Sequence, residues 1–248
     1  YINRLKLQPE SRHKAFKVYV NDKVNLVVSG IGRNNAAAAA AYLGAQSAPA
    51  GSVSLWLNVG IAGHKTQPIG AVVVAHKVIE RASGRTYYPL VYPVQLATSL
   101  LVTVDVPDTD YLDDAAFDME ASGFMAAASK FAPLEFVQSV KVVSDNPSSG
   151  VNAVTAKSIE GAMSESVDEV LELIKLMTHS ASHHIAQTYL PESFSTLQSK
   201  LRFSATQQVQ LKRLCQRYSA LGLEDRLEQL AATELESAKQ VIQRLDAD

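Results

Sequence analysis

The sequence contains a single cysteine, Cys215, among its 248 residues. One cysteine cannot form an internal disulfide, and no cysteine and histidine array has zinc-binding spacing, so the composition favours a reducing compartment, and we expect a cytoplasmic location. No apolar run approaches the ~20 residues that a membrane-spanning helix needs, and the N-terminus lacks the pattern of a signal peptide. We therefore expect a globular protein without a membrane partner.

An excess of either charge is also missing. The chain has 23 lysines and arginines against 25 aspartates and glutamates, a net charge of -2. Binding to a nucleic-acid backbone needs a basic face, so we expect no nucleic-acid partner. At 47% hydrophobic residues, the chain can bury the core of one large domain, or of one domain with an appendage.

Short apolar runs alternate with helical segments through the first part of the chain. Residues 16–30 form two β-rich runs separated by Asn21-Asp22, which predicts a hairpin whose second run is buried on both faces. A polyalanine helix follows, and 117–131 is predicted as a second helix. The remaining apolar runs predict strands at 52–60, 69–80, 99–107 and 135–146. This alternation is typical of an α/β layer architecture with a largely parallel sheet.

The character of the chain changes after about Val151, where helical periodicity replaces the strand signals. We predict one domain over residues 1–180 and a helical extension of two or three helices over 181–248. Within the extension, Ser204 is suited to a helix N-cap and Gly222 to a helix C-terminus.

Two glycine-rich turns follow predicted strands. Gly30 and Gly32 lie between a strand and a helix, where backbone N–H groups can bind a phosphate or a polar sugar, or where glycine simply permits a tight turn. Gly60 and Gly63 repeat the arrangement at the end of the next strand. In open parallel sheets the ligand crevice lies outside the carboxyl ends of the strands, so the two turns could line one crevice.

Asp145 comes shortly after the apolar run VKVV, near the carboxyl end of the predicted strand 135–146. It could form a turn or cap the next helix. Alternatively, it places a carboxyl group at the crevice, where burial would favour the protonated form that donates a proton.

Glu120 lies on a segment that otherwise has the pattern of a buried helix, beside Phe124 and Met125. Burial of an uncompensated carboxylate is very costly, so Glu120 must have a partner. An arginine or a helix N-terminus could serve, and so could two adjacent hydroxyls such as those of ribose.

Other polar residues are weaker candidates. Arg33 is interpreted as a solvated residue at a helix start, and His64 as a minor candidate for substrate contact or proton transfer. His179 and His183 lie four residues apart, but without an acidic third ligand nearby we favour a solvated helix surface over a metal site.

Taken in order, the motifs SGIG, NVGIAG, IGAVVVA, DMEA and VVSDN resemble those of the purine nucleoside phosphorylase superfamily, in particular its methylthioadenosine/S-adenosylhomocysteine nucleosidase and futalosine hydrolase branch. The resemblance covers roughly residues 15–178. It implies a three-layer α/β/α domain around a mixed, partly barrel-like sheet, followed here by the C-terminal helical extension. It also implies assembly into a homodimer or a larger homo-oligomer, and a reaction that needs no cofactor and no metal.

The resemblance further implies roles for particular residues. Glu120 would bind the ribose hydroxyls with Met119 beside the sugar, and Asp145, preceded by Ser144, would protonate the purine base so that it leaves. The backbone turn near the nucleophile and the ribose would be formed by Gly60, Ala62 and Gly63. The implied activity is cleavage of the N-glycosidic bond of a purine-type nucleoside.

Three departures from the family pattern bear on the type of reaction. Nucleosidases have a glutamate after their first strand, and we expect that strand to lie upstream of the sequence, which starts on the segment that would follow it. Ile61 stands where a serine or threonine is common, and Asn58 and Val59 stand where phosphorylases have an arginine. Hydrolysis is therefore favoured over phosphorolysis, and a noncatalytic nucleoside-binding module on the same fold is the alternative. For residues 181–248 the hypotheses are an oligomerisation element, a lid or a docking surface for a protein partner.

Overall fold

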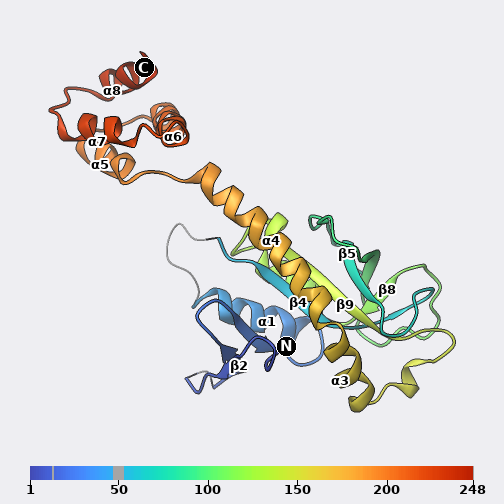
Figure 1. Ribbon diagram of the computed structural model, residues 1–248. Coiled ribbons are helices and arrows are strands. Elements are labelled where there is room, and N and C mark those ends of the chain that lie inside the picture. The colour runs from blue at the N-terminus through green and yellow to red at the C-terminus, as the bar shows by residue number, and fades with distance from the viewer. Residues whose placement is uncertain (13, 47–52, 248) are drawn as a thin grey trace. The chain divides into compact units, whose positions relative to one another are not determined.

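The computed structural model describes residues 1–12, 14–46 and 53–247, and its ribbon is shown in Figure 1. Ser52, the first residue of one predicted strand, lies outside the described residues. The chain divides into two compact units, Tyr1–Ala181 and Ser182–Asp248. We describe each unit by itself.

Five strands of the first unit close into a barrel. Neighbours pair in the order β5, β7, β8, β4 and β9, and β9 pairs back with β5. The pairs β4–β9, β5–β7 and β7–β8 are parallel, whereas β4–β8 and β5–β9 are antiparallel. The predicted mixed, partly barrel-like sheet is confirmed, and the largely parallel sheet inferred from alternation alone is too simple. The strands are β4 (Trp56–His64), β5 (Val72–Glu80), β6 (Thr86–Tyr87, paired only with β5), β7 (Ala97–Thr103), β8 (Ala116–Asp118) and β9 (Val137–Asp145).

Helices cover the sheet on two sides, which confirms the predicted layers (Figure 1). Side chains on β5 alternate between two cores: Val73 packs with α1 and α2, whereas Val74 packs with α4. This is the period of two expected for a strand buried on both faces. The helices that start in this unit are α1 (Arg33–Gly44), α2 (Ala121–Ala128), α3 (Ala156–Glu165) and α4 (Val167–Thr188), whose last residues continue past Ala181, with short 3₁₀ helices at Leu134–Phe136 and Val151–Ala153.

The N-terminal hairpin is confirmed, with β2 (Lys17–Val20) antiparallel to β3 (Asn25–Val28). Together with β1 (Gln8–Pro9) they form a separate three-stranded sheet. The prediction that the second run is buried on both faces is wrong, because β3 lies at the edge of this small sheet and not inside the barrel, and Val28 is exposed.

The segment 117–131 is only partly helical. Its first residues belong to β8, which pairs with β4 and β7 and completes the barrel, and α2 starts after Glu120. A strand of three residues has too short a pattern to be distinguished from a helix start by periodicity.

The second unit contains four helices within residues 192–247, one more than the upper end of the prediction. They are α5 (Glu192–Lys200), α6 (Ala205–Ala220), α7 (Glu224–Ala232) and α8 (Ala238–Ala247). Ser204 caps α6, and Gly222, with a φ of 69°, follows its end, as predicted. Residues such as Leu211, Tyr218 and Val241 form a core of this unit's own.

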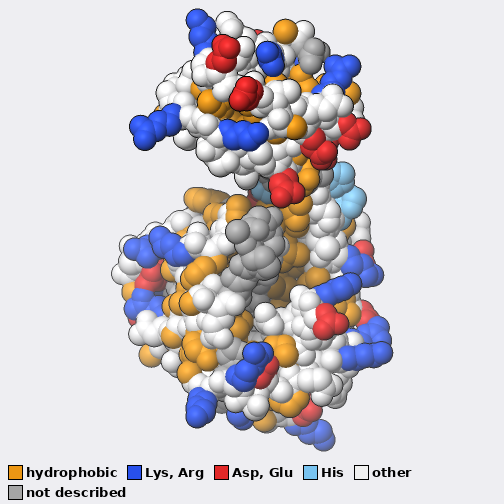
Figure 2. Space-filling model, turned by 90° about the vertical axis from the view of Figure 1, so that its left-hand side faces the viewer, with side chains coloured by type: hydrophobic (Ala, Val, Ile, Leu, Met, Phe, Trp, Pro, Cys, Tyr) orange, Lys and Arg blue, Asp and Glu red, His pale blue; other side chains and the backbone are white. Residues whose placement is uncertain are grey.

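On the face shown in Figure 2, basic and acidic side chains are interspersed on each unit, as the balanced composition suggests. Among the described residues, no helix has the length and the apolar character needed to cross a membrane.

Candidate functional site

Glu120 connects the first glycine turn to the start of α2. It is the N-cap residue of α2, and its Oε1 accepts a hydrogen bond of 2.8 Å from the backbone N–H of Gly32. Gly32 in turn is the N-cap of α1 and has a φ of 99°, which favours glycine. The partner of Glu120 is thus a helix N-terminus, but that of α1 instead of its own. The Glu120 side chain remains 22% exposed, so its carboxylate can also meet a ligand.

A lysine inside the barrel wall provides the second partner of Glu120. Lys141 on β9 has a side chain that is only 1% exposed, and its Nζ lies 2.8 Å from Asp118 Oδ2 and 3.9 Å from Glu120 Oε2. Gly60 lies opposite Lys141 on β4, and a Cβ there would come within 3.1 Å of Nζ. One buried ammonium faces two carboxylates, so the group has one net negative charge.

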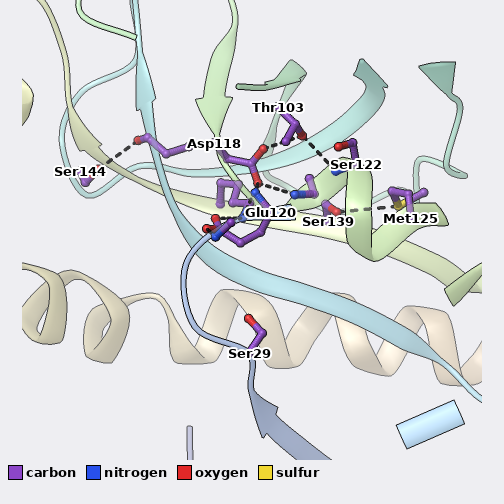
Figure 3. A network of polar contacts seen from close by, with 12 residues as sticks. Ser29, Thr103, Asp118, Glu120, Ser122, Met125, Ser139 and Ser144 are labelled. Carbon is purple, nitrogen blue, oxygen red and sulfur yellow. Dashed lines mark hydrogen bonds and ion pairs between the residues drawn. The ribbon is translucent and has the colours of Figure 1, made fainter. Parts of the chain in front are cut away.

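Asp118 fixes the geometry of this group. Its Oδ1 accepts a hydrogen bond of 2.8 Å from Thr103 Oγ1, and its Oδ2 accepts one of 2.8 Å from the Ala121 N–H. The Ser122 N–H donates to Thr103 Oγ1, so β7 and β8 together satisfy the first turn of α2. Figure 3 shows Asp118, Thr103 and Ser122 pointing toward one another with Glu120 beside them. The start of α2, and Glu120 with it, is therefore held in place.

Asp145 is the last residue of β9 and is buried. Ser144 Oγ lies 2.5 Å from its Oδ1, and the hydroxyl of Tyr111 donates a short hydrogen bond to its Oδ2. Gly63 lies opposite Asp145 on β4, and a Cβ there would come within 2.5 Å of Asp145 Oδ2. Gly63 is thus required for the close approach of the Asp145 carboxyl group. The predicted second glycine turn is wrong, because β4 continues to His64 and both Gly60 and Gly63 lie inside the strand.

Tyr111 is held as a hydrogen-bond donor. Burial raises the pKa of its phenol above the ordinary value, and the hydrogen bond to Asp145 and the negative charges of Asp145 and Asp108 raise this pKa further. The ring contacts Phe117 edge-on with centroids 6.4 Å apart.

The strand register relates the two carboxylates. Asp145 lies at the level of Gly63, whereas Lys141, the neighbour of Glu120, lies at the level of Gly60. Asp145 thus belongs to the β4–β9 strand pair, whereas Glu120, at the start of α2, is connected to that pair through Lys141.

The other predicted residues lie around this strand pair. Met119 packs in the cluster that contains Tyr111 and Phe117, and Ala62 is buried opposite Val143. Ser144 Oγ is also 3.3 Å from the carbonyl of Ala62.

His64 has a structural role in the fold. Its Nδ1 accepts hydrogen bonds of 3.2 Å from the N–H groups of Thr66 and Gln67, so the proton resides on Nε2, which lies 3.0 Å from Ser99 Oγ. Burial lowers the pKa of His64, which favours this neutral form. All of its nitrogens are therefore engaged within the chain.

Arg33 is the first residue of α1, as predicted, but its side chain is only 33% exposed and is paired instead of simply solvated. Its guanidinium pairs with Glu80 and, at 2.9 Å, with Asp105. For His179 and His183, the described part of the chain contains no cluster of three or more potential metal ligands.

Sequence reasoning missed two residues of the site, Lys141 and Tyr111. A signal for Lys141 was present, because a charged residue within an apolar strand must have a buried partner. Tyr111 lies in a loop without a diagnostic pattern, and only the fold brings it to Asp145.

Comparisons with known proteins place this geometry on a known fold. A scan against protein-family models and a search of curated proteins find no match. Solved structures do match, and nucleosidases are among them. The structure is similar to a 5′-methylthioadenosine/S-adenosylhomocysteine nucleosidase from Colwellia psychrerythraea in complex with adenine, at 20% identity and a TM-score of 0.51 over 71% of this chain and 88% of the other.

Two further structures give the same result. The nucleosidase from S. pneumoniae, solved with a transition-state inhibitor, is 19% identical with a TM-score of 0.54, over 71% of this chain and 94% of the other. The nucleosidase from Neisseria meningitidis, in complex with methylthio-immucillin-A, is 19% identical with a TM-score of 0.53, over 70% and 94%. At these identities the likeness shows the fold, and the phosphorylase-type fold predicted from the order of the motifs is confirmed.

Proposed function

We propose that the protein cleaves the N-glycosidic bond of a purine-type nucleoside by hydrolysis, with Asp145 as the general acid and Glu120 as the ribose anchor. The observation that carries the proposal is that both carboxyl groups border the β4–β9 strand pair: Asp145 ends β9 opposite Gly63, and Glu120 contacts Lys141, which lies opposite Gly60. A nucleoside would present its ribose hydroxyls to Glu120 and its heterocycle to Asp145. The nucleosidases with the same fold bind adenine or nucleoside-like inhibitors.

The charges around Glu120 are suited to stabilising a transition state with a positively charged sugar. Glu120 Oε1 accepts a hydrogen bond from the Gly32 N–H, whereas Oε2 lies 3.9 Å from Lys141 Nζ, which is beyond hydrogen-bond distance. Oε2 can therefore accept hydrogen bonds from ribose hydroxyls. The net negative charge of Lys141, Asp118 and Glu120 would stabilise the positive charge that develops on the sugar as the bond to the base breaks. Met119 would pack beside the sugar.

Asp145 would supply the proton that makes the base a neutral leaving group. Its position beside Gly63 supports this role, because a side chain at residue 63 would collide with the Asp145 carboxyl group. The Ser144 hydroxyl, 2.5 Å from Oδ1, would orient the carboxyl group. A positioned acid of this kind contributes about 10²- to 10⁴-fold in rate.

Hydrolysis is favoured over phosphorolysis because the N–H of Gly32 is already paired. A glycine turn at a helix N-terminus is a common site for phosphate. Here, however, the Gly32 N–H already donates a hydrogen bond to the Glu120 carboxylate. A phosphate at this turn would meet a negative charge instead of a free donor.

One observation favours a second candidate, a nucleoside-binding module without catalysis. Both oxygens of Asp145 already accept hydroxyl hydrogen bonds within the chain, one from Ser144 and one from Tyr111. If these bonds persist when a nucleoside binds, Asp145 cannot transfer a proton to the base.

Release of free base from methylthioadenosine, adenosine and inosine, measured with and without phosphate, separates these functions. We expect release that does not depend on phosphate. Glu120→Gln should weaken the binding of ribosides by about tenfold or more, since it loses a charge-assisted hydrogen bond, and should leave the binding of free adenine unchanged. Binding without any release would support the module, and release that requires phosphate would support a phosphorylase.

The setting of this activity is a further part of the proposal. We infer a cytoplasmic enzyme that acts as a homodimer or larger homo-oligomer, with residues 181–248 available for contacts with another protein chain. The single cysteine, Cys215, supports the location.

A further inference from the structure

The ring of Tyr111 lies where the proposed function requires a base. Its hydroxyl donates to Asp145 Oδ2, the acid of the proposed reaction, and its Cε1 would be 3.1 Å from a Cβ at Gly63. The side chain is an aromatic ring with one hydrogen-bond donor, and it is 5% exposed. A purine with an N–H group directed at Asp145 would have the same chemistry.

The backbone that presents this ring is strained. Tyr111 has a φ of 47°, in the left-handed region that costs a residue with a side chain of this size roughly 1–2 kcal/mol. Such a conformation persists only when other contacts hold it. One of these contacts is local, because Asp108 Oδ1 accepts hydrogen bonds from the Tyr111 and Asp110 N–H groups.

The rest of the loop lies on the surface. Between residues 105 and 114, Tyr111 is the only buried residue. On the C-terminal side of Tyr111, two hydrogen bonds connect the loop to residues 65 and 66. Lys65 Nζ donates to the Leu112 carbonyl at 2.6 Å, and Thr66 Oγ1 donates to Asp114 Oδ1 at 2.7 Å. On the N-terminal side of Tyr111, residues 104–110 line a cavity of about 350 Å³, so this part of the loop is not tightly packed.

We propose that Tyr111 is a specificity-determining residue that occupies the base position in the ligand-free protein, so that a ligand must displace it from Asp145. This inference rests on the proposed function for the identity of the ligand. The competition selects flat heterocycles with an N–H donor, because only such a ligand replaces both the ring and the hydrogen bond. A sugar alone replaces neither.

The test is the affinity for free adenine, measured by calorimetry on the full chain. Tyr111→Phe keeps the ring and removes the competing hydroxyl, so Asp145 lacks one donor until adenine supplies it. The adenine Kd should fall about tenfold, the size of one hydrogen bond to a charged group. Tyr111→Gly, which adopts the positive φ without strain and removes the ring as well, should lower the Kd further.

Tyr92→Phe is the matched control. Tyr92 is also 5% exposed, and its hydroxyl donates to the carbonyl of Glu135, at a distance of 2.7 Å and away from Asp145. Loss of this hydroxyl should lower the thermal stability and leave the adenine Kd unchanged. A merely structural role of Tyr111 predicts the same outcome for Tyr111→Phe, and an unchanged or higher Kd in that variant overturns the proposal. Failure of the wild type and both Tyr111 variants to bind adenine overturns it as well.

Base release distinguishes a failure of this inference from a failure of the proposed function. If the wild type releases base and Tyr111→Phe does not change the adenine Kd, the function stands and the inference about Tyr111 is wrong. If Tyr111→Phe binds adenine more tightly but no variant releases base, Tyr111 competes for the site as proposed and the hydrolase function is wrong.

Discussion

At the scale of single residues, the site is organised by one buried positive charge. Lys141 lies between Val140 and Val142 on β9, and its ammonium is retained there by the carboxylates of Asp118 and Glu120. A pair such as Lys141 and Asp118 adds little net stability over an apolar pair, but a single member left alone is strongly destabilising. The main effect of this charge group is therefore to fix the orientation of the Glu120 side chain.

Lys141→Met should therefore destabilise the first unit by about 3–5 kcal/mol, because the buried carboxylate of Asp118 loses its counter-ion. Chemical denaturation followed by circular dichroism would measure the change. Lys175→Met is a suitable control, since Lys175 pairs with Glu172 on an exposed helix surface and should change the stability by less than about 1 kcal/mol. Equal effects of the two substitutions would contradict the account of the Lys141 group.

At the scale of secondary-structure elements, the contact between α1 and α2 brings the glycine turn to Glu120. Gly123 on α2 lies directly against the first residue of α1, and a Cβ there would be only 1.9 Å from the carbonyl oxygen of Arg33. The neighbouring atom is backbone, so it cannot rotate away. The close approach of the two helices, and with it the Gly32–Glu120 hydrogen bond, depends on this glycine.

Gly123→Ala should destabilise the protein by about 1–3 kcal/mol and should also weaken riboside binding, because it separates the start of α1 from Glu120. Gly161→Ala provides the matched comparison. Gly161 is within α3 and a Cβ there meets no neighbouring atom, so alanine should be neutral or stabilising by up to ~1 kcal/mol. Thermal melts and riboside titrations of both variants check the prediction, and a neutral Gly123→Ala would show that the helices can separate freely.

The strands and helices also differ in how well the sequence predicts them. Strands such as β5 and β9 were predicted because both are rich in valine, as expected for strands that are buried in the sheet. The three-residue β8 was not, because its strand identity comes from its partners β4 and β7. In the same way, Asp145 and Glu120 were visible next to strand and helix ends, whereas Tyr111 became visible only when the fold placed a distant loop on Asp145.

At the scale of the whole molecule, the chain has separate hydrophobic cores in its two compact units. Leu173 is fully buried in a core with β5 and β9, and Leu211 is fully buried in a core formed by residues of the second unit alone. Separate cores allow each unit to unfold as its own cooperative transition.

Calorimetry of the full chain should therefore resolve two unfolding transitions. Leu173→Ala should lower the midpoint of one and Leu211→Ala that of the other, since removal of a buried leucine side chain costs about 2–5 kcal/mol. A single transition that both substitutions shift would contradict the independence of the two cores.

The central claim is that the protein cleaves nucleosides with Asp145 as the general acid. It is tested most directly by base release from methylthioadenosine in the wild type and in Asp145→Asn. Asparagine keeps the shape of the side chain but cannot supply the proton, so release should fall at least about 10²-fold while nucleoside binding is largely retained. Release at the same rate in both proteins, or no release by the wild type, would contradict the claim.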